Sequence, residues 1–154
     1  MMGWPVFLTV PRAPDFVVGD EDDVYLRRWW IVPHNRWFNV YLHNFCRSDD
    51  DRALHDHPWV NVSVVLSGGY NEHTANRIYL RKPWRPWAPW RVTIRTARAA
   101  HRVELLPGGA PVWTIFITGP KTREWGFLCP QGWRHWRDFV SLRPGGNSVG
   151  RGCE

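Results

Sequence analysis

The sequence predicts an all-β protein with a single domain, a sandwich or small barrel of short antiparallel strands. The chain has 154 residues, which is enough for one hydrophobic core. Its 13 prolines and 13 glycines interrupt the chain at short intervals and disfavour long helices. Between them lie short runs rich in β-branched and aromatic residues, a composition typical of strands.

Six of these runs are expected to form the strands of the domain. They lie at residues 24–32, 37–46, 60–66, 91–96, 101–105 and 112–118. Residues 1–23, with their prolines and a run of acidic residues, are expected to form an N-terminal arm. A short helix is predicted over 133–140, as a lid that packs on the sheet and completes a domain of residues 24–140. Residues 141–154 lack core residues and are expected to form a flexible tail.

The composition excludes several classes of protein. With 44% hydrophobic and 22% charged residues, the chain is expected to fold rather than to be disordered. It has no apolar run of the length that a membrane helix needs, and its first residues lack the features of a signal peptide. Cys46, Cys129 and Cys153 are odd in number and far apart, so we expect no disulfide framework and a cytoplasmic, reducing environment.

Two histidines that lie two positions apart are the strongest candidates for chemistry. His55 and His57 belong to the run Leu-His-Asp-His-Pro. On a strand, residues i and i+2 point to the same face, so both imidazoles can reach one cavity. This is the geometry that a facial metal site needs. Two isolated histidines with this spacing are also common on protein surfaces, so further residues have to define the site.

The segment around this pair resembles the first motif of the cupin superfamily, in which the two histidines are followed by a glutamate and then a glycine. His55 and His57 match the histidines, and Gly68 falls in register with the glycine. Asn61 occupies the position of the glutamate, and Asp49 occupies that of a leading glycine. The resemblance therefore keeps the histidines and departs at two positions.

The second cupin motif centres on one histidine, which His101 matches at the start of a predicted strand. Around it, Thr96 and Arg98 stand where the family has proline and glycine, and Leu105 stands where it has asparagine. The two motifs together span roughly residues 45–120. The chain is thus similar to cupins in three histidines and in its pattern of strands.

The resemblance implies a jelly-roll-like antiparallel β-barrel with a divalent transition metal held by His55, His57 and His101. Asn61 offers only a neutral oxygen, which would leave a three-histidine centre with a charge of two. Thiol dioxygenases of the superfamily also lack the glutamate, and their Fe(II) takes substrate and oxygen. We therefore expect a small-molecule dioxygenase with a small anionic substrate. Fe(II) is the favoured metal, with manganese, nickel and zinc as alternatives.

Other polar residues near the motifs have roles that the sequence leaves open. Glu72 and His73 are alternative metal donors if the strand after the Gly-Gly turn doubles back. Asn61, Arg98 and His43 are candidates for contacts to the metal ligands or the substrate, Arg98 through a bidentate carboxylate contact. The net charge of +6 comes mostly from arginine, although a GC-rich coding sequence gives the same excess.

A triplet repeat of proline, tryptophan and a mostly basic residue runs over 82–91. In a polyproline II helix it would present one indole edge, suited to single-stranded bases. We expect instead that Trp84, Trp87 and Trp90 are covered by the protein itself, because three bare indoles favour aggregation. The sequence leaves two alternatives to the enzyme. The first is a non-catalytic or regulatory ligand-binding cupin, and the second is a nucleic-acid-associated protein. The resemblance to cupins, which frequently dimerise, makes a homodimer one possible state, and the sequence leaves the oligomeric state open. Membrane and nucleic acid are not expected partners.

Overall fold

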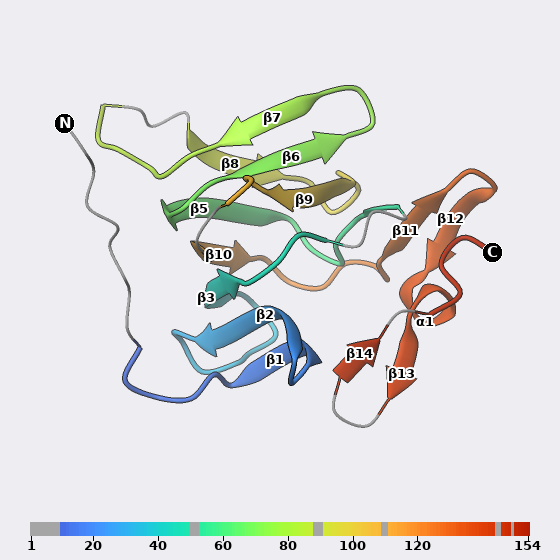
Figure 1. Cartoon of the computed structure of the whole chain (residues 1–154), viewed down its shortest axis with the longest axis horizontal. Helices are drawn as coiled ribbons and strands as arrows, with labels where there is room; N and C mark the ends of the chain where they lie inside the picture. Colours follow the sequence, from blue (N-terminus) through green and yellow to red (C-terminus); the bar gives the residue numbers. More distant parts are fainter. Residues whose placement is uncertain (1–9, 50–52, 88–90, 109–110, 144–145, 149) are drawn as a thin grey trace.

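The structure is a computed structural model, and it describes residues 10–49, 53–87, 91–108, 111–143, 146–148 and 150–154. The regular secondary structure of the described residues is almost entirely β-strand, and most of the strands pair antiparallel in two six-stranded sheets (Figure 1). The prediction of an all-β fold is confirmed. Closure of the strands into a barrel stays a prediction, because the hydrogen bonding defines two sheets with separate strand orders.

The first sheet contains, in spatial order, β1 (Phe16–Asp20), β2 (Asp23–Trp30), β3 (Asn39–Phe45), β10 (Val112–Thr118), β5 (Asn61–Ser67) and β8 (Val92–Arg95). The second contains β12 (Gly132–His135), β11 (Gly126–Cys129), β4 (Leu54–His55), β9 (His101–Leu105), β6 (Tyr70–Thr74) and β7 (Ile78–Arg81). All six predicted strands are present, with ends that differ by at most a few residues. The remaining elements are α1 (Trp136–Phe139) and a hairpin of β13 (Ser141–Arg143) and β14 (Gly146–Ser148).

The two sheets meet in a small apolar core. Val65 and Val112 come from the first sheet, and Tyr70 and Val103 come from the second. Alternation along the strands sends these side chains inward, since β5 and β10 bury every second residue over most of their length. Tyr70 and Val103 also line the main cavity, so the core supports one side of it.

The predicted helix over 133–140 is wrong in its first half. Residues Gly132–His135 form β12, which pairs with β11 in a tight hairpin. Gly132 has a φ of 122°, a conformation that glycine adopts without strain and that favours a turn over a helix start. Only four residues, Trp136–Phe139, are helical, and Phe139 stacks on Phe127 of β11 with ring centroids 3.6 Å apart. Ladder hydrogen bonds of the hairpin therefore replace the first three residues of the expected helix.

The prediction that the cysteines form no disulfide is also wrong. Cys129, the last residue of β11, is bonded to Cys153, although 24 positions separate them. The chain returns through α1, β13 and β14, with β14 beside β1, so residues distant in sequence become neighbours. The predicted flexible tail at 141–154 thus contains a hairpin and a disulfide, and residues 16–20 of the predicted arm form β1. The cysteines no longer argue for a reducing compartment.

The covering predicted for the tryptophan repeat fails where the structure describes it. Trp84 is 41% exposed and Trp87 is 73% exposed, while Trp90 lies outside the described residues. The backbone N–H of Trp84 donates to the carbonyl of Val65 at 2.8 Å, which anchors the start of the repeat to β5. The described part of the chain contains no helix long and apolar enough to cross a bilayer.

Replacing Cys153 with serine should lower the free energy of unfolding by about 3 kcal/mol, the value for opening a closed loop of this length. Chemical denaturation with and without reductant measures this, and reductant should destabilise the wild type but not the variant. Cys46→Ser is the matched control, because Cys46 is the free thiol and accepts a hydrogen bond from Arg27 at 3.0 Å. Equal unfolding curves for the wild type with and without reductant would contradict the disulfide.

Candidate metal centre

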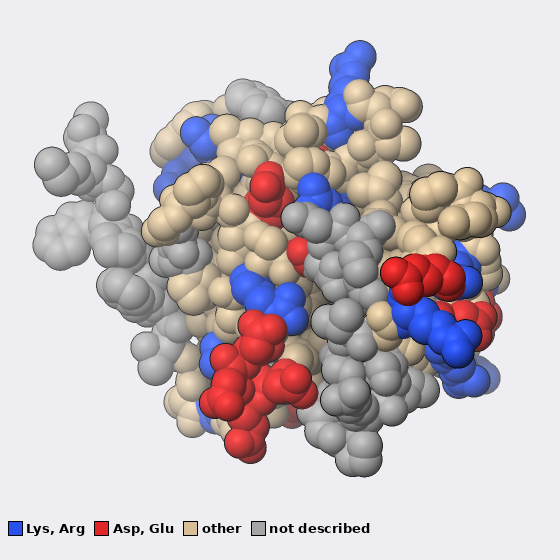
Figure 2. Space-filling model, turned by 45° about the vertical axis from the view of Figure 1, so that its right-hand side comes forward, with Lys and Arg blue, Asp and Glu red and all other residues tan. Residues whose placement is uncertain are grey.

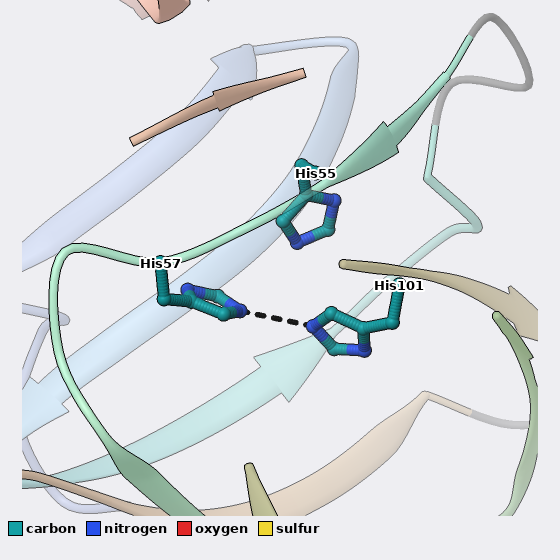
Figure 3. A group of neighbouring side chains, drawn as sticks. All are labelled: His55, His57 and His101. Carbon is teal, nitrogen blue, oxygen red and sulfur yellow. Dashed lines mark hydrogen bonds between the residues drawn. The ribbon is translucent and has the colours of Figure 1, made fainter. Parts of the chain in front are cut away.

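The structure brings the three predicted histidines together between the sheets (Figure 3). His55 of β4 and His101 of β9 are direct partners in the antiparallel register, and His57 follows two residues later on the same side. One ring nitrogen from each of the three lies within 4.8 Å of the others. The Nε2 atoms of His57 and His101 are 2.9 Å apart.

The spacing of His57 and His101 suits a shared metal ion. Metal–imidazole bonds are about 2.1 Å long, so two ligands at right angles have nitrogens about 3.0 Å apart. The Nε2 atoms of His57 and His101 already have that spacing. His55 would supply the third ligand, and all three histidines line the cavity. The donor set therefore fits a divalent transition metal.

Glu72 holds His101 in place from behind. Its side chain is almost completely buried, with a residue exposure of 1%, and Oε1 lies 2.9 Å from Nδ1 of His101. Arg81 donates through Nε to Oε2 at 2.6 Å, and Arg95 donates through Nε to Oε1 at 2.5 Å. Burial alone would raise the pKa of Glu72, but the hydrogen bond from His101 and the charges of Arg95 and Arg81 lower it to about 2. The carboxylate is therefore ionised across the whole physiological range.

An ionised Glu72 fixes the tautomer of His101. A carboxylate only accepts hydrogen bonds, so the ring proton sits on Nδ1 and the lone pair of Nε2 faces the site. Burial lowers the pKa of His101 to about 4, against the opposing effect of the hydrogen bond to Glu72. Burial and the neighbouring His101 and His55 lower the pKa of His57 well below its ordinary value. These rings are neutral at pH 7 and offer lone pairs, the form that binds metals.

Asp49 plays a similar part for His55. Its Oδ2 lies 3.5 Å from Nδ1 of His55 and accepts the backbone N–H of Val103 at 2.7 Å. The hydroxyl of Tyr25 donates to the other carboxylate oxygen. Asp49 is thus held by partners from three strands or their ends, and it can orient His55 through the nitrogen that faces away from the site. Its place just before the histidine pair is the signal that identifies it in the sequence.

The histidines open into a cavity of about 320 Å³ between the sheets. Its walls are mostly apolar and aromatic, with Phe116, Trp125 and Trp136 among them. His43, a predicted site residue, lines it and is 3% exposed. Burial lowers the pKa of His43 well below its ordinary value, with a further lowering by Arg28. The volume is that of a small-molecule site.

The other predicted site residues lie around this centre rather than in it. Asn61 is buried, and its Oδ1 accepts a hydrogen bond from Nη1 of Arg95 at 3.4 Å. His73 pairs through Nε2 with Glu104 at 2.8 Å, so that nitrogen is engaged elsewhere. Glu72 contacts His101 but does not belong to the group of three donors. Arg98 lies exposed on the connection between β8 and β9 and does not line the cavity.

Solved structures with a similar fold are cupins. A cupin-like protein from Thermotoga maritima has a TM-score of 0.53 and 14% identity, with 72% of this chain and 80% of that chain covered. A Klebsiella pneumoniae protein with a double-stranded β-helix domain has a TM-score of 0.50 and 16% identity, with 66% and 78% covered. The DMSP lyase DddQ from Ruegeria pomeroyi has a TM-score of 0.53 and 10% identity, with 70% of this chain covered but 54% of the lyase.

No protein-family model matches the sequence, and a search of curated proteins finds no match. Similarity at these identities shows the fold alone. The chain has the cupin, or double-stranded β-helix, fold, as the histidine motifs imply. Within that fold it carries a histidine triad that could hold a metal ion.

Glu72→Gln should lower the free energy of unfolding by about 3–5 kcal/mol, because it leaves the buried Arg95 and the partly buried Arg81 without their counter-charge. The pKa of about 2 lies below the ordinary 4.5, so the stabilisation from ionised Glu72 is fully present above pH 4.5. It is lost as the pH falls toward 2, and the difference between wild type and variant should shrink over that window. Denaturant unfolding at a series of pH values measures it.

Glu104→Gln is the control for this substitution, because Glu104 is also paired with a histidine but its side chain is 44% exposed. It should leave the free energy of unfolding nearly unchanged, because an ion pair in solvent contributes little. An equal cost for both variants, or a difference that is the same at every pH, would contradict the role given to Glu72.

Proposed function

We propose that the protein binds one divalent transition metal through His55, His57 and His101 and acts on a small anionic molecule as an oxygenase. The observation that carries the proposal is the convergence of three imidazoles beside a cavity, with one ring nitrogen from each within 4.8 Å of the other two. Glu72 and Asp49 contact the far nitrogens of two of them, the usual support of a metal-binding histidine.

The charge of the centre favours an anion. When bound, the metal would supply a Lewis-acidic centre with open positions for substrate and oxygen. The three imidazoles are neutral ligands and do not offset its charge, and the nearby carboxylate of Glu72 is already shared between Arg81 and Arg95. A carboxylate, thiolate or enolate therefore gains more from this cavity than a neutral molecule does.

The walls of the cavity favour the same reaction because they limit the access of water to the site. Phe116 packs beside His57 with ring centroids 5.8 Å apart, and Trp125 stacks on Trp136 at 5.7 Å. Aromatic walls lower the local polarity, which strengthens the attraction between a charged centre and an anionic substrate. They also shield a reactive centre from bulk solvent. We propose Fe(II) as the working metal, with manganese, nickel and zinc able to occupy the same ligands.

Protein produced in metal-replete medium should contain close to one transition metal per chain. His57→Ala and His101→Ala should lose it, because each removes one of three ligands, whereas His73→Ala should keep it. Elemental analysis after gel filtration measures the content. Loss of metal in His73→Ala with retention in His57→Ala would place the ion at the alternative donors and contradict the proposed ligand set.

Protein loaded with Fe(II) should consume oxygen in the presence of a small carboxylate that carries a thiol, hydroxyl or keto group. An oxygen electrode with cysteine, lactate and pyruvate as probes measures this. The zinc-loaded protein and His101→Ala should show only the background rate. Uptake that is equal in His101→Ala would contradict catalysis at the site, and uptake with none of the probes would favour the non-catalytic ligand-binding cupin.

A further inference from the structure

Arg28 of β2 places a positive charge in the same cavity as the histidines. Its Nε donates to Nε2 of His43 at 2.9 Å. The guanidinium also lies over the ring of Tyr41, 4.7 Å from its centroid, and 5.8 Å from that of Phe16. Stacking covers the face of a guanidinium and leaves its in-plane N–H groups to make hydrogen bonds.

The charge of Arg28 has no acidic partner within the described part of the chain, where no aspartate or glutamate forms an ion pair with it. His43 does not compensate it either, since this ring is neutral and accepts the hydrogen bond through a lone pair. On the surface, by contrast, acidic and basic side chains lie beside one another (Figure 2). A charge taken into a cavity costs free energy unless a counter-charge joins it.

Arg28 and the metal-binding histidines line the same cavity, and Phe116 contacts both groups. Phe116 stacks on His43, the partner of Arg28, with ring centroids 5.0 Å apart, and it packs against His57 at 5.8 Å. One aromatic ring therefore lies between the imidazole that holds Arg28 and the imidazole that faces the metal position.

Two hydrogen-bond donors beside the cavity strengthen the case for an acceptor ligand. His43 is 3% exposed, and with its Nε2 accepting from Arg28 its proton is on Nδ1. Within the described residues neither this Nδ1 nor the buried indole Nε1 of Trp59 has a hydrogen-bond partner. Both side chains line the cavity. Buried donors without partners are rare in folded proteins and indicate a missing acceptor.

We infer that the substrate is a carboxylic acid with a second metal-binding group, and that Arg28 holds its carboxylate while the second group reaches the metal at His55, His57 and His101. This inference rests on the proposed metal site and adds the class of substrate. A guanidinium binds a carboxylate through two parallel hydrogen bonds, which orients the molecule as well as attracting it. Both ends of such a molecule would lie in the cavity that Arg28, Phe116 and the three histidines line. Arg28 is then a specificity-determining residue, the part that the sequence predicted for Arg98.

The inference is tested with zinc-loaded protein and three probes, the dicarboxylates glutarate and succinate and the monocarboxylate butyrate. Isothermal titration calorimetry measures their affinities. One or both dicarboxylates should bind at least about ten-fold more tightly than butyrate, since they use both ends of the site. Arg28→Met should remove that advantage and weaken dicarboxylate binding by about ten-fold or more, while its zinc content stays at the wild-type level.

Arg27→Met is the matched control. Arg27 is the neighbouring residue on the opposite face of β2, where it contacts Cys46 and Asn44, and its loss removes the same charge. It should leave dicarboxylate binding unchanged. If Arg28→Met unfolds, Arg28→Lys keeps the charge without the planar fork, and dicarboxylate binding should then fall between wild type and background.

Equal affinity of Arg28→Met and wild type for the dicarboxylates would overturn the inference, as would equal losses in Arg28→Met and Arg27→Met. Failure of the metal site has a different signature. In that case wild type would take up no zinc and would not prefer dicarboxylates, and a weak binding of butyrate that depends on Arg28 would remain as the sign of the carboxylate site alone.

Discussion

The buried carboxylate of Glu72 is the interaction on which the rest of this site depends. It accepts hydrogen bonds from Arg81 of β7 and Arg95 of β8, and it lies against His101 of β9. Because Arg95 belongs to the first sheet and the other partners to the second, one carboxylate ties the two sheets together across the interior. A buried charge is stable only when it is fully paired, so this cluster has to form as a unit. Once formed, it fixes both the position and the proton of the ligand histidine.

The polar cluster explains why the space between the sheets is a cavity rather than a continuous apolar core. β5 and β10 send Ser63 and Thr114 inward, and β3 sends His43 inward. Such residues cannot fill a core by apolar packing, and Ser63 and His43 add polar groups to the mostly apolar walls of the cavity. The apolar cluster of Val65 and its neighbours supports one side, and the disulfide at Cys129 anchors the C-terminal end of the chain.

Local patterns in the sequence predicted the parts of the molecule that depend on local physics. Runs of β-branched residues identified six strands, and the spacing of His55 and His57, with His101 at a strand start, identified the three converging imidazoles. The errors arose where distant segments meet. The pairing of Cys129 with Cys153 depends on the return path of the chain, and β12 replaced part of a helix because β11 lay beside it.

The roles of the residues around the histidines also depend on contacts between distant segments, which the sequence does not show. Glu72 appeared in the sequence only as an alternative ligand, because its contacts to Arg95 and His101 depend on the register of three strands. Arg28 had no local signal among many arginines, and its role follows only from the side of β2 that faces the cavity. Asp49 appeared in the sequence only at the position of a leading glycine, although an acidic residue before a histidine pair is well placed to orient one of the rings.

The most direct test of the account is the metal environment in the folded protein, measured by anomalous X-ray diffraction from crystals of zinc-loaded protein. The account predicts one anomalous peak about 2.1 Å from the Nε2 atoms of His57 and His101, with His55 as the third protein ligand. Glu72 should remain on Nδ1 of His101, and no carboxylate of the chain should reach the metal. A peak ligated by Glu72 or His73, or no peak at the three histidines, would contradict it.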